Sequence, residues 1–98
     1  MTLQKDPDHT ERKTLHRLVD FAHKRVLEIG CGEGRLTWQY AGEARSVAAM
    51  DLDHDALRVA RADRPSDLEG IVHLACADSE HLPFAKDTFD RAVLAWSL

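Results

Sequence analysis

The chain has 98 residues, 44% of them hydrophobic and 31% charged, with a formal net charge of -4 when the histidines are neutral. This composition excludes intrinsic disorder, and the length allows one domain at most. The acidic balance also argues against nucleic-acid binding, which usually needs a basic surface.

The absence of targeting and disulfide signals predicts a cytoplasmic protein. No apolar run approaches the roughly 18–20 residues that span a bilayer, and the N-terminus lacks the apolar core of a signal peptide. Two cysteines, Cys31 and Cys76, are too few for a disulfide scaffold, so we expect both to be reduced. His9, His16 and His23 would share a helix face but lie ~10 Å apart, too far for one metal ion to bridge. We predict no metal site.

Hydrophobic spacing predicts alternating helices and strands. Apolar residues recur at helical intervals in three segments and form short continuous runs, typical of buried strands, in four others. Asp8 and Asp53 are candidate N-caps of the first and third helices, and Pro65 ends the third. Residues 78–86 are expected to form a loop or one short helix, interrupted by Pro83. In chain order, the predicted elements are helix 9–24, strand 25–29, helix 35–44, strand 46–51, helix 53–62, strand 71–76 and strand 91–96.

This alternation indicates the fold class. Apolar strands separated by helices favour parallel pairing, with helices covering the sheet. Right-handed crossovers leave only a few topologies. We therefore predict a doubly wound, Rossmann-like α/β domain.

The segment VLEIGCGEG (26–34) predicts a ligand-binding loop. A strand delivers glycines to the start of a helix, where positive φ angles and unpaired N–H groups let a ligand approach the backbone. Asp51 ends the next strand about 20 residues after Gly30, where an acidic side chain can accept hydrogen bonds from ribose hydroxyls. The glycines alternate as G-x-G-x-G, whereas the dinucleotide fingerprint is G-x-G-x-x-G/A, and Arg35 occupies its last position. This spacing disfavours a nicotinamide dinucleotide.

The same segment resembles the first motif of the class I S-adenosylmethionine-dependent methyltransferases. The similarity runs from about Leu15 to the end of the chain and includes ADSEHLPF (77–84) and DTFD (87–90), which leads into RAVLAW. The resemblance implies a seven-stranded sheet, of which only strands one to four can be read here, in the order 3-2-1-4. It also implies S-adenosylmethionine as the cofactor and a small-molecule methyl acceptor, as in enzymes of the ubiquinone and menaquinone type.

The resemblance further implies a cofactor site built mostly from strand ends. Glu28 and the backbone of residues 30–34 would contact the methionine part, and Asp51 the ribose, with Leu52 beside the adenine. Asp78 would lie near the adenine amino group, Ser79 would offer its backbone, and Ala95 would approach the methionine end. The expected cofactor-binding residues are Glu28, Gly30, Cys31, Gly32, Gly34, Asp51, Leu52, Asp78, Ser79 and Ala95.

Methyl transfer requires alignment and a water-poor pocket more than covalent participation by the protein. A general base would come from loops after the fourth strand, so no catalytic residue is assigned. Because the readable strands stop there, we expect residues 1–98 to be the N-terminal part of one methyltransferase domain. Two alternatives are a non-catalytic cofactor-binding module that needs a partner and an NAD-dependent oxidoreductase. Cys31 could be a nucleophile at a helix start, but a small loop residue is the favoured interpretation.

Overall fold

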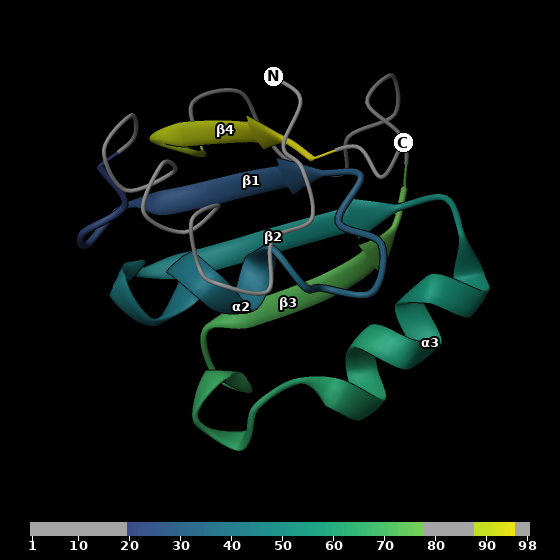
Figure 1. Ribbon diagram of the computed structural model, residues 1–98. Helices are drawn as coiled ribbons and strands as arrows, with labels where there is room; N and C mark the ends of the chain where they lie inside the picture. The colour runs from purple at the N-terminus through teal and green to yellow at the C-terminus, as the bar shows by residue number, and fades with distance from the viewer. Residues whose placement is uncertain (1–19, 78–87, 96–98) are drawn as a thin grey trace.

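The computed structural model describes residues 20–77 and 88–95. In this part of the chain, four parallel strands form one sheet with the order β3-β2-β1-β4 (Figure 1). The predicted Rossmann-like α/β fold and the order 3-2-1-4 are therefore confirmed. The strands are β1 (Arg25–Ile29), β2 (Ser46–Asp51), β3 (Val72–Cys76) and β4 (Arg91–Leu94).

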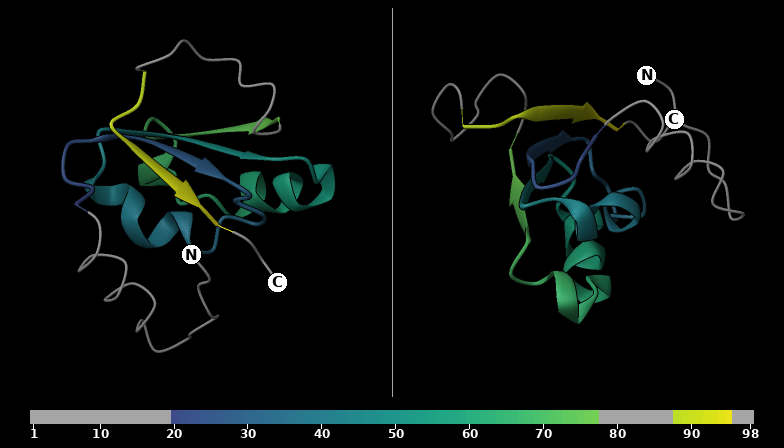
Figure 2. Two further views of the ribbon diagram at one scale, coloured as in Figure 1. Left: turned by 90° about the horizontal axis from the view of Figure 1, so that it is seen from above. Right: turned by 90° about the vertical axis from the view of Figure 1, so that its left-hand side faces the viewer.

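The described helices lie on one face of this sheet (Figure 2). They are α2 (Thr37–Tyr40), η1 (Ala41–Glu43), α3 (His54–Asp63) and η2 (Ser66–Leu68), where η denotes a 3-10 helix. Right-handed crossovers from β1 to β2 and from β2 to β3 place both connections on the same face. The chain then returns to β4, which pairs with β1 on the side away from β2. Residues 78–87 of that connection lie outside the described ranges, as does the loop or short helix predicted there.

Side chains of β1 and β2 alternate between two apolar clusters, as the pleat of a strand requires. The larger cluster lies beneath the helices, and a smaller one, made by Leu27, Ala48 and Met50, lies on the other face. The helix-side cluster includes Phe21, Val26, Tyr40, Val47, Ala49, Leu57, Leu68, Val72 and Val93.

Two predicted helices differ from the structure. The helix predicted to reach Lys24 does not do so, because residues 20–24 form a turn in which the Asp20 carboxylate accepts the Ala22 N–H and His23 has φ 60°. The rest of that predicted helix lies outside the described residues. The helix predicted over 35–44 is only α2 followed by η1, whose last bond runs from Ala44 N to Ala41 O. Tighter i→i+3 bonding of this kind is common where a helix ends.

The third predicted helix is confirmed, together with its cap. The Asp53 carboxylate accepts the N–H groups of Asp55 and Ala56, at 3.0 and 3.1 Å, and so satisfies two of the donors that a helix start leaves unpaired. Leu57 and Ala60 face inward, as their spacing predicts. None of the helices within residues 20–77 and 88–95 combines the length and apolarity that crossing a membrane requires.

Candidate functional site

The glycine loop, residues 30–34, leaves the carboxyl end of β1 and leads toward α2. The N–H groups of Gly30 and Cys31 donate to the Met50 carbonyl, at 2.8 and 3.0 Å, which fastens the start of the loop to β2. At its far end, the Trp38 N–H donates to the Gly34 carbonyl at 3.0 Å. The loop is thus held by the sheet on one side and by a helix on the other.

Two glycines of this loop have different surroundings. Gly34 has φ 87°, and a β-carbon there would overlap the indole ring of Trp38. Gly32 has φ 57°, and a β-carbon there would meet no atom within 4 Å. Gly34 is therefore needed for packing inside the protein, whereas the space above Gly32 is open for a ligand to approach the backbone.

Asp51, the last residue of β2, joins the loop to the neighbouring strand. One of its carboxylate oxygens accepts the Gly32 N–H at 2.8 Å, and the other accepts the Asp53 N–H at 2.9 Å. A carboxylate has about four lone-pair positions, so these two bonds leave capacity for further donors. Leu52 follows directly and is 63% exposed, an unusual exposure for a large apolar side chain beside a strand end.

Ala95 brings β4 to the same edge of the sheet. Its N–H donates to the Ile29 carbonyl at 2.9 Å, directly before the glycine loop. The carboxyl ends of β1, β2 and β4 therefore lie side by side. From β1 the chain proceeds to β2 on one side, and it later returns to β4 on the other side, so the strand order reverses at β1. In open α/β sheets, ligands bind at such a switch point.

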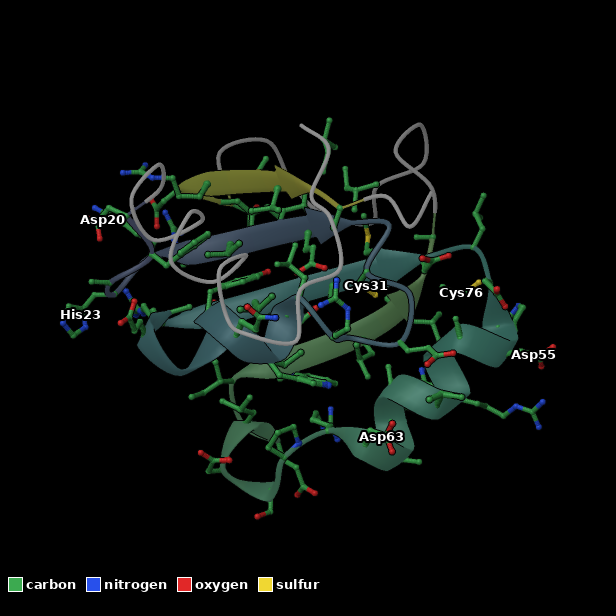
Figure 3. All side chains as sticks on the ribbon, viewed as in Figure 1. Asp20, His23, Cys31, Asp55, Asp63 and Cys76 are labelled. Atoms are coloured by element: carbon green, nitrogen blue, oxygen red, sulfur yellow. The ribbon has the colours of Figure 1, made fainter. Side chains whose placement is uncertain are left out.

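Cys31 is buried within this loop. Burial raises the pKa of its thiol to about 12, with a further contribution from the charge of Glu28. The thiol is therefore protonated near neutral pH, which agrees with a loop residue rather than a nucleophile. Figure 3 shows Cys31 at the loop and the exposed Cys76 near the start of α3, and both thiols are free.

Glu28 lies two residues before the loop, on the face of β1 that the helices cover, and is fully buried. The Thr37 hydroxyl lies 3.0 Å from both carboxylate oxygens, and the Tyr40 hydroxyl donates to one of them. Burial raises the pKa of Glu28 to about 7, although the two hydroxyl bonds act in the opposite direction. Full burial leaves none of this side chain accessible to a ligand in the structure as it stands.

A family model described as a methyltransferase domain matches residues 26–98. The chain belongs to this methyltransferase family. The match covers all four strands and the glycine loop, and it confirms the resemblance to class I S-adenosylmethionine-dependent methyltransferases.

Relatives of this methyltransferase chain include small-molecule enzymes. The chain is 38% identical over 77 residues to methyltransferase GfsG of Streptomyces halstedii, covering 76% of this chain and 28% of that protein. It is 37% identical over 79 residues to the ubiquinone/menaquinone biosynthesis C-methyltransferase UbiE of Vibrio vulnificus, covering 76% of this chain and 30% of UbiE. The chain thus spans under a third of the length of these relatives.

A solved structure supports the same assignment. The S-adenosylmethionine dependent methyltransferase of Mesorhizobium loti superposes with a TM-score of 0.70 at 27% identity, covering 84% of this chain and 37% of that one.

The methyltransferase structure brings most of the predicted site residues together. Gly30, Cys31, Gly32, Gly34, Asp51, Leu52 and Ala95 gather at the carboxyl edge of the sheet. Glu28 instead lies inside the protein against α2, and Asp78 and Ser79 lie outside the described residues. Thr37 and Tyr40, the hydrogen-bond partners of Glu28, were not predicted from the sequence. The sequence signal for this contact is limited to two hydroxyl-bearing residues, three positions apart, on the inner face of a helix.

Proposed function

We propose that this chain binds S-adenosylmethionine and serves in methyl transfer to a small-molecule acceptor. The observation that carries the proposal is the junction between Asp51 and Gly32, where a carboxylate and a glycine with open space above it lie at the switch point. Family membership makes S-adenosylmethionine the cofactor to test. When bound, this cofactor supplies a methyl group carried on a sulfonium.

The residues present fit such a cofactor. We assign the ribose hydroxyls to Asp51, which retains accepting capacity, and the adenine to the exposed face of Leu52. The backbone of the 30–34 loop and Ala95 would border the methionine end. Asp78 and Ser79 remain predicted contacts of the adenine side.

The small-molecule class of the acceptor rests on the relatives and on charge. UbiE is named for ubiquinone and menaquinone biosynthesis, and the net charge of -4 does not favour a nucleic-acid substrate. The contribution of the chain to catalysis would be alignment of the cofactor, together with exclusion of water at the loop.

Calorimetric titration of the 98-residue chain with S-adenosylhomocysteine and, separately, with NAD tests the cofactor. We expect saturable binding of S-adenosylhomocysteine and none of NAD at the same concentration. Selective binding of NAD would contradict the proposal and favour the oxidoreductase alternative. Incubation with labelled S-adenosylmethionine and quinol-type acceptors, whose electron-rich ring can attack the methyl group, then separates an enzyme from a binding module, since a binding module retains the label on the cofactor.

A further inference from the structure

A buried hydrogen-bond network joins β1 to α2 behind the glycine loop. Glu28, Thr37 and Tyr40 are all 0% exposed. The network consists of the Glu28 carboxylate and the two hydroxyls that contact it. The ring of Tyr40 also stacks on Phe21, with 4.3 Å between centroids, which fixes the direction of its hydroxyl.

Stability alone does not explain this network. A carboxyl group in an apolar interior loses its hydration, and among the described contacts its partners are neutral hydroxyls rather than a cation. Well-packed apolar residues often replace buried polar groups without loss of stability. A polar group buried this deeply is therefore better explained by a role in positioning nearby backbone than by a contribution to stability.

The network lies where it can set the geometry of the loop. Residues 30–34 are fastened to β2 through Met50 at one end and to α2 through the Trp38 N–H at the other. Gly34 is also packed beneath the Trp38 ring. Any shift of α2 relative to β1 therefore moves the loop, and the network opposes that shift.

We propose that Thr37 and Tyr40, acting through Glu28, are positioning residues that hold the 30–34 loop in the form that accepts the methionine part of the cofactor. This inference rests on the proposed function, because S-adenosylmethionine defines which end of the ligand meets the loop. It gives Glu28 a role in holding α2 on β1, beside the contact with the methionine part that the resemblance implies.

Paired titrations with S-adenosylhomocysteine and adenosine test the proposal, because adenosine lacks the methionine part. Tyr40→Phe keeps the ring that stacks on Phe21 and removes only the hydroxyl. We expect it to raise the Kd for S-adenosylhomocysteine by about tenfold and the Kd for adenosine by less than about twofold. Leu57→Ala, a core change in α3 away from the network, is the matched control. It should lower stability without altering the ratio of the two Kd values.

Thr37 supplies a second, independent pair of variants, which also serves if Tyr40→Phe does not fold. Thr37→Val removes the hydroxyl at similar size, whereas Thr37→Ser retains it. We expect Thr37→Val to weaken the binding of S-adenosylhomocysteine more than that of adenosine. Thr37→Ser should keep the wild-type ratio of the two Kd values. Unchanged ratios in both Tyr40→Phe and Thr37→Val would overturn the positioning role while leaving the proposed function intact. A wild-type chain that binds neither ligand would overturn the proposed function, and this inference with it.

Discussion

At the amino end of the sheet Asp90 pairs with a guanidinium, whereas near the carboxyl end Glu28 is buried against two hydroxyls. Asp90 accepts the Arg25 backbone N–H at 2.9 Å and its Nε at 3.2 Å, and the Asp90 N–H donates to the Arg25 carbonyl at 2.8 Å. These hydrogen bonds lower the pKa of Asp90 to about 2. Burial raises the pKa of Glu28 to about 7.

The contrast distinguishes the end of the sheet that maintains the fold from the end at which we propose that the ligand binds. The Arg25–Asp90 pair joins the starts of β1 and β4, and its charged form favours the native state. The carboxyl end instead holds a desolvated acid, three glycines at positive φ and a carboxylate that binds loop amides. Backbone at positive φ and desolvated acids of this kind cost stability and are typical of functional sites.

The largest expected effect separates packing from ligand access within the loop. Gly34→Ala combines a positive φ with overlap on Trp38, so we expect it to lower the free energy of unfolding by about 3 kcal/mol. Gly32→Ala meets open space and should lower it by only about 1 kcal/mol. Its added methyl group should instead weaken S-adenosylhomocysteine binding. Urea unfolding and calorimetry measure both quantities, and equal destabilisation by the two changes would refute the distinction.

Glu28→Gln tests the desolvated acid. In the unfolded chain Glu28 loses its proton near its ordinary pKa of 4.5, whereas in the fold it holds the proton until about pH 7. The native state therefore binds more protons in this window, and the contribution of Glu28 to stability falls as the pH rises from about 4.5 to 7. Between pH 4.5 and 8, the free energy of unfolding of Glu28→Gln should therefore rise relative to that of wild type by up to about 3 kcal/mol. Parallel stability curves for the two proteins across this range would contradict the assignment.

Asp51→Ala tests the ligand side of the same edge. The substitution removes the acceptor assigned to the ribose hydroxyls and the bond to the Gly32 N–H. Charge-assisted hydrogen bonds contribute about 1.5–3 kcal/mol, so the Kd for S-adenosylhomocysteine should rise at least about tenfold. Asp53→Ala is the control, because it removes the cap of α3 without the loop bond. It should lower stability and leave the Kd within about twofold. A Kd unchanged by Asp51→Ala would remove the ribose assignment.

Local sequence patterns predicted most of this architecture, because short apolar runs and an Asp N-cap determine structure only within a few residues of their own position. The strands, the cap at Asp53 and the placement of Asp51 after β2 all follow from such patterns. The division of helix 35–44 into α2 and η1 does not, nor does the turn at His23, because apolar spacing alone carries no strong stop signal at either place.

The interior of the candidate site was harder to predict than its rim. The family resemblance implied a contact between Glu28 and the methionine part of the cofactor, and this contact stays a prediction. The orientation of the Glu28 side chain depends on where α2 packs on the sheet and on the rotation that brings Thr37 and Tyr40 over β1. That rotation is a tertiary property, so a hydrogen-bond partner nine or twelve residues away could not be identified from spacing.

The smallest expected effect comes from the amino end of the sheet. Asp90 titrates near its ordinary pKa of 3.8 when unfolded and near 2 in the fold, so its contribution to stability is present above about pH 4 and is lost as the pH falls toward 2. Asp90→Asn should therefore flatten this acidic part of the stability curve and leave the 4.5 to 7 window, assigned to Glu28, unchanged. Because both partners are solvent-exposed, added salt should reduce the difference between wild type and variant. Unfolding by urea at pH 2 and pH 5, each at low and high salt, measures it. An Asp90→Asn curve that also lost its slope between pH 4.5 and 7 would show that the two carboxylates are coupled, and that the two ends of the sheet do not act independently.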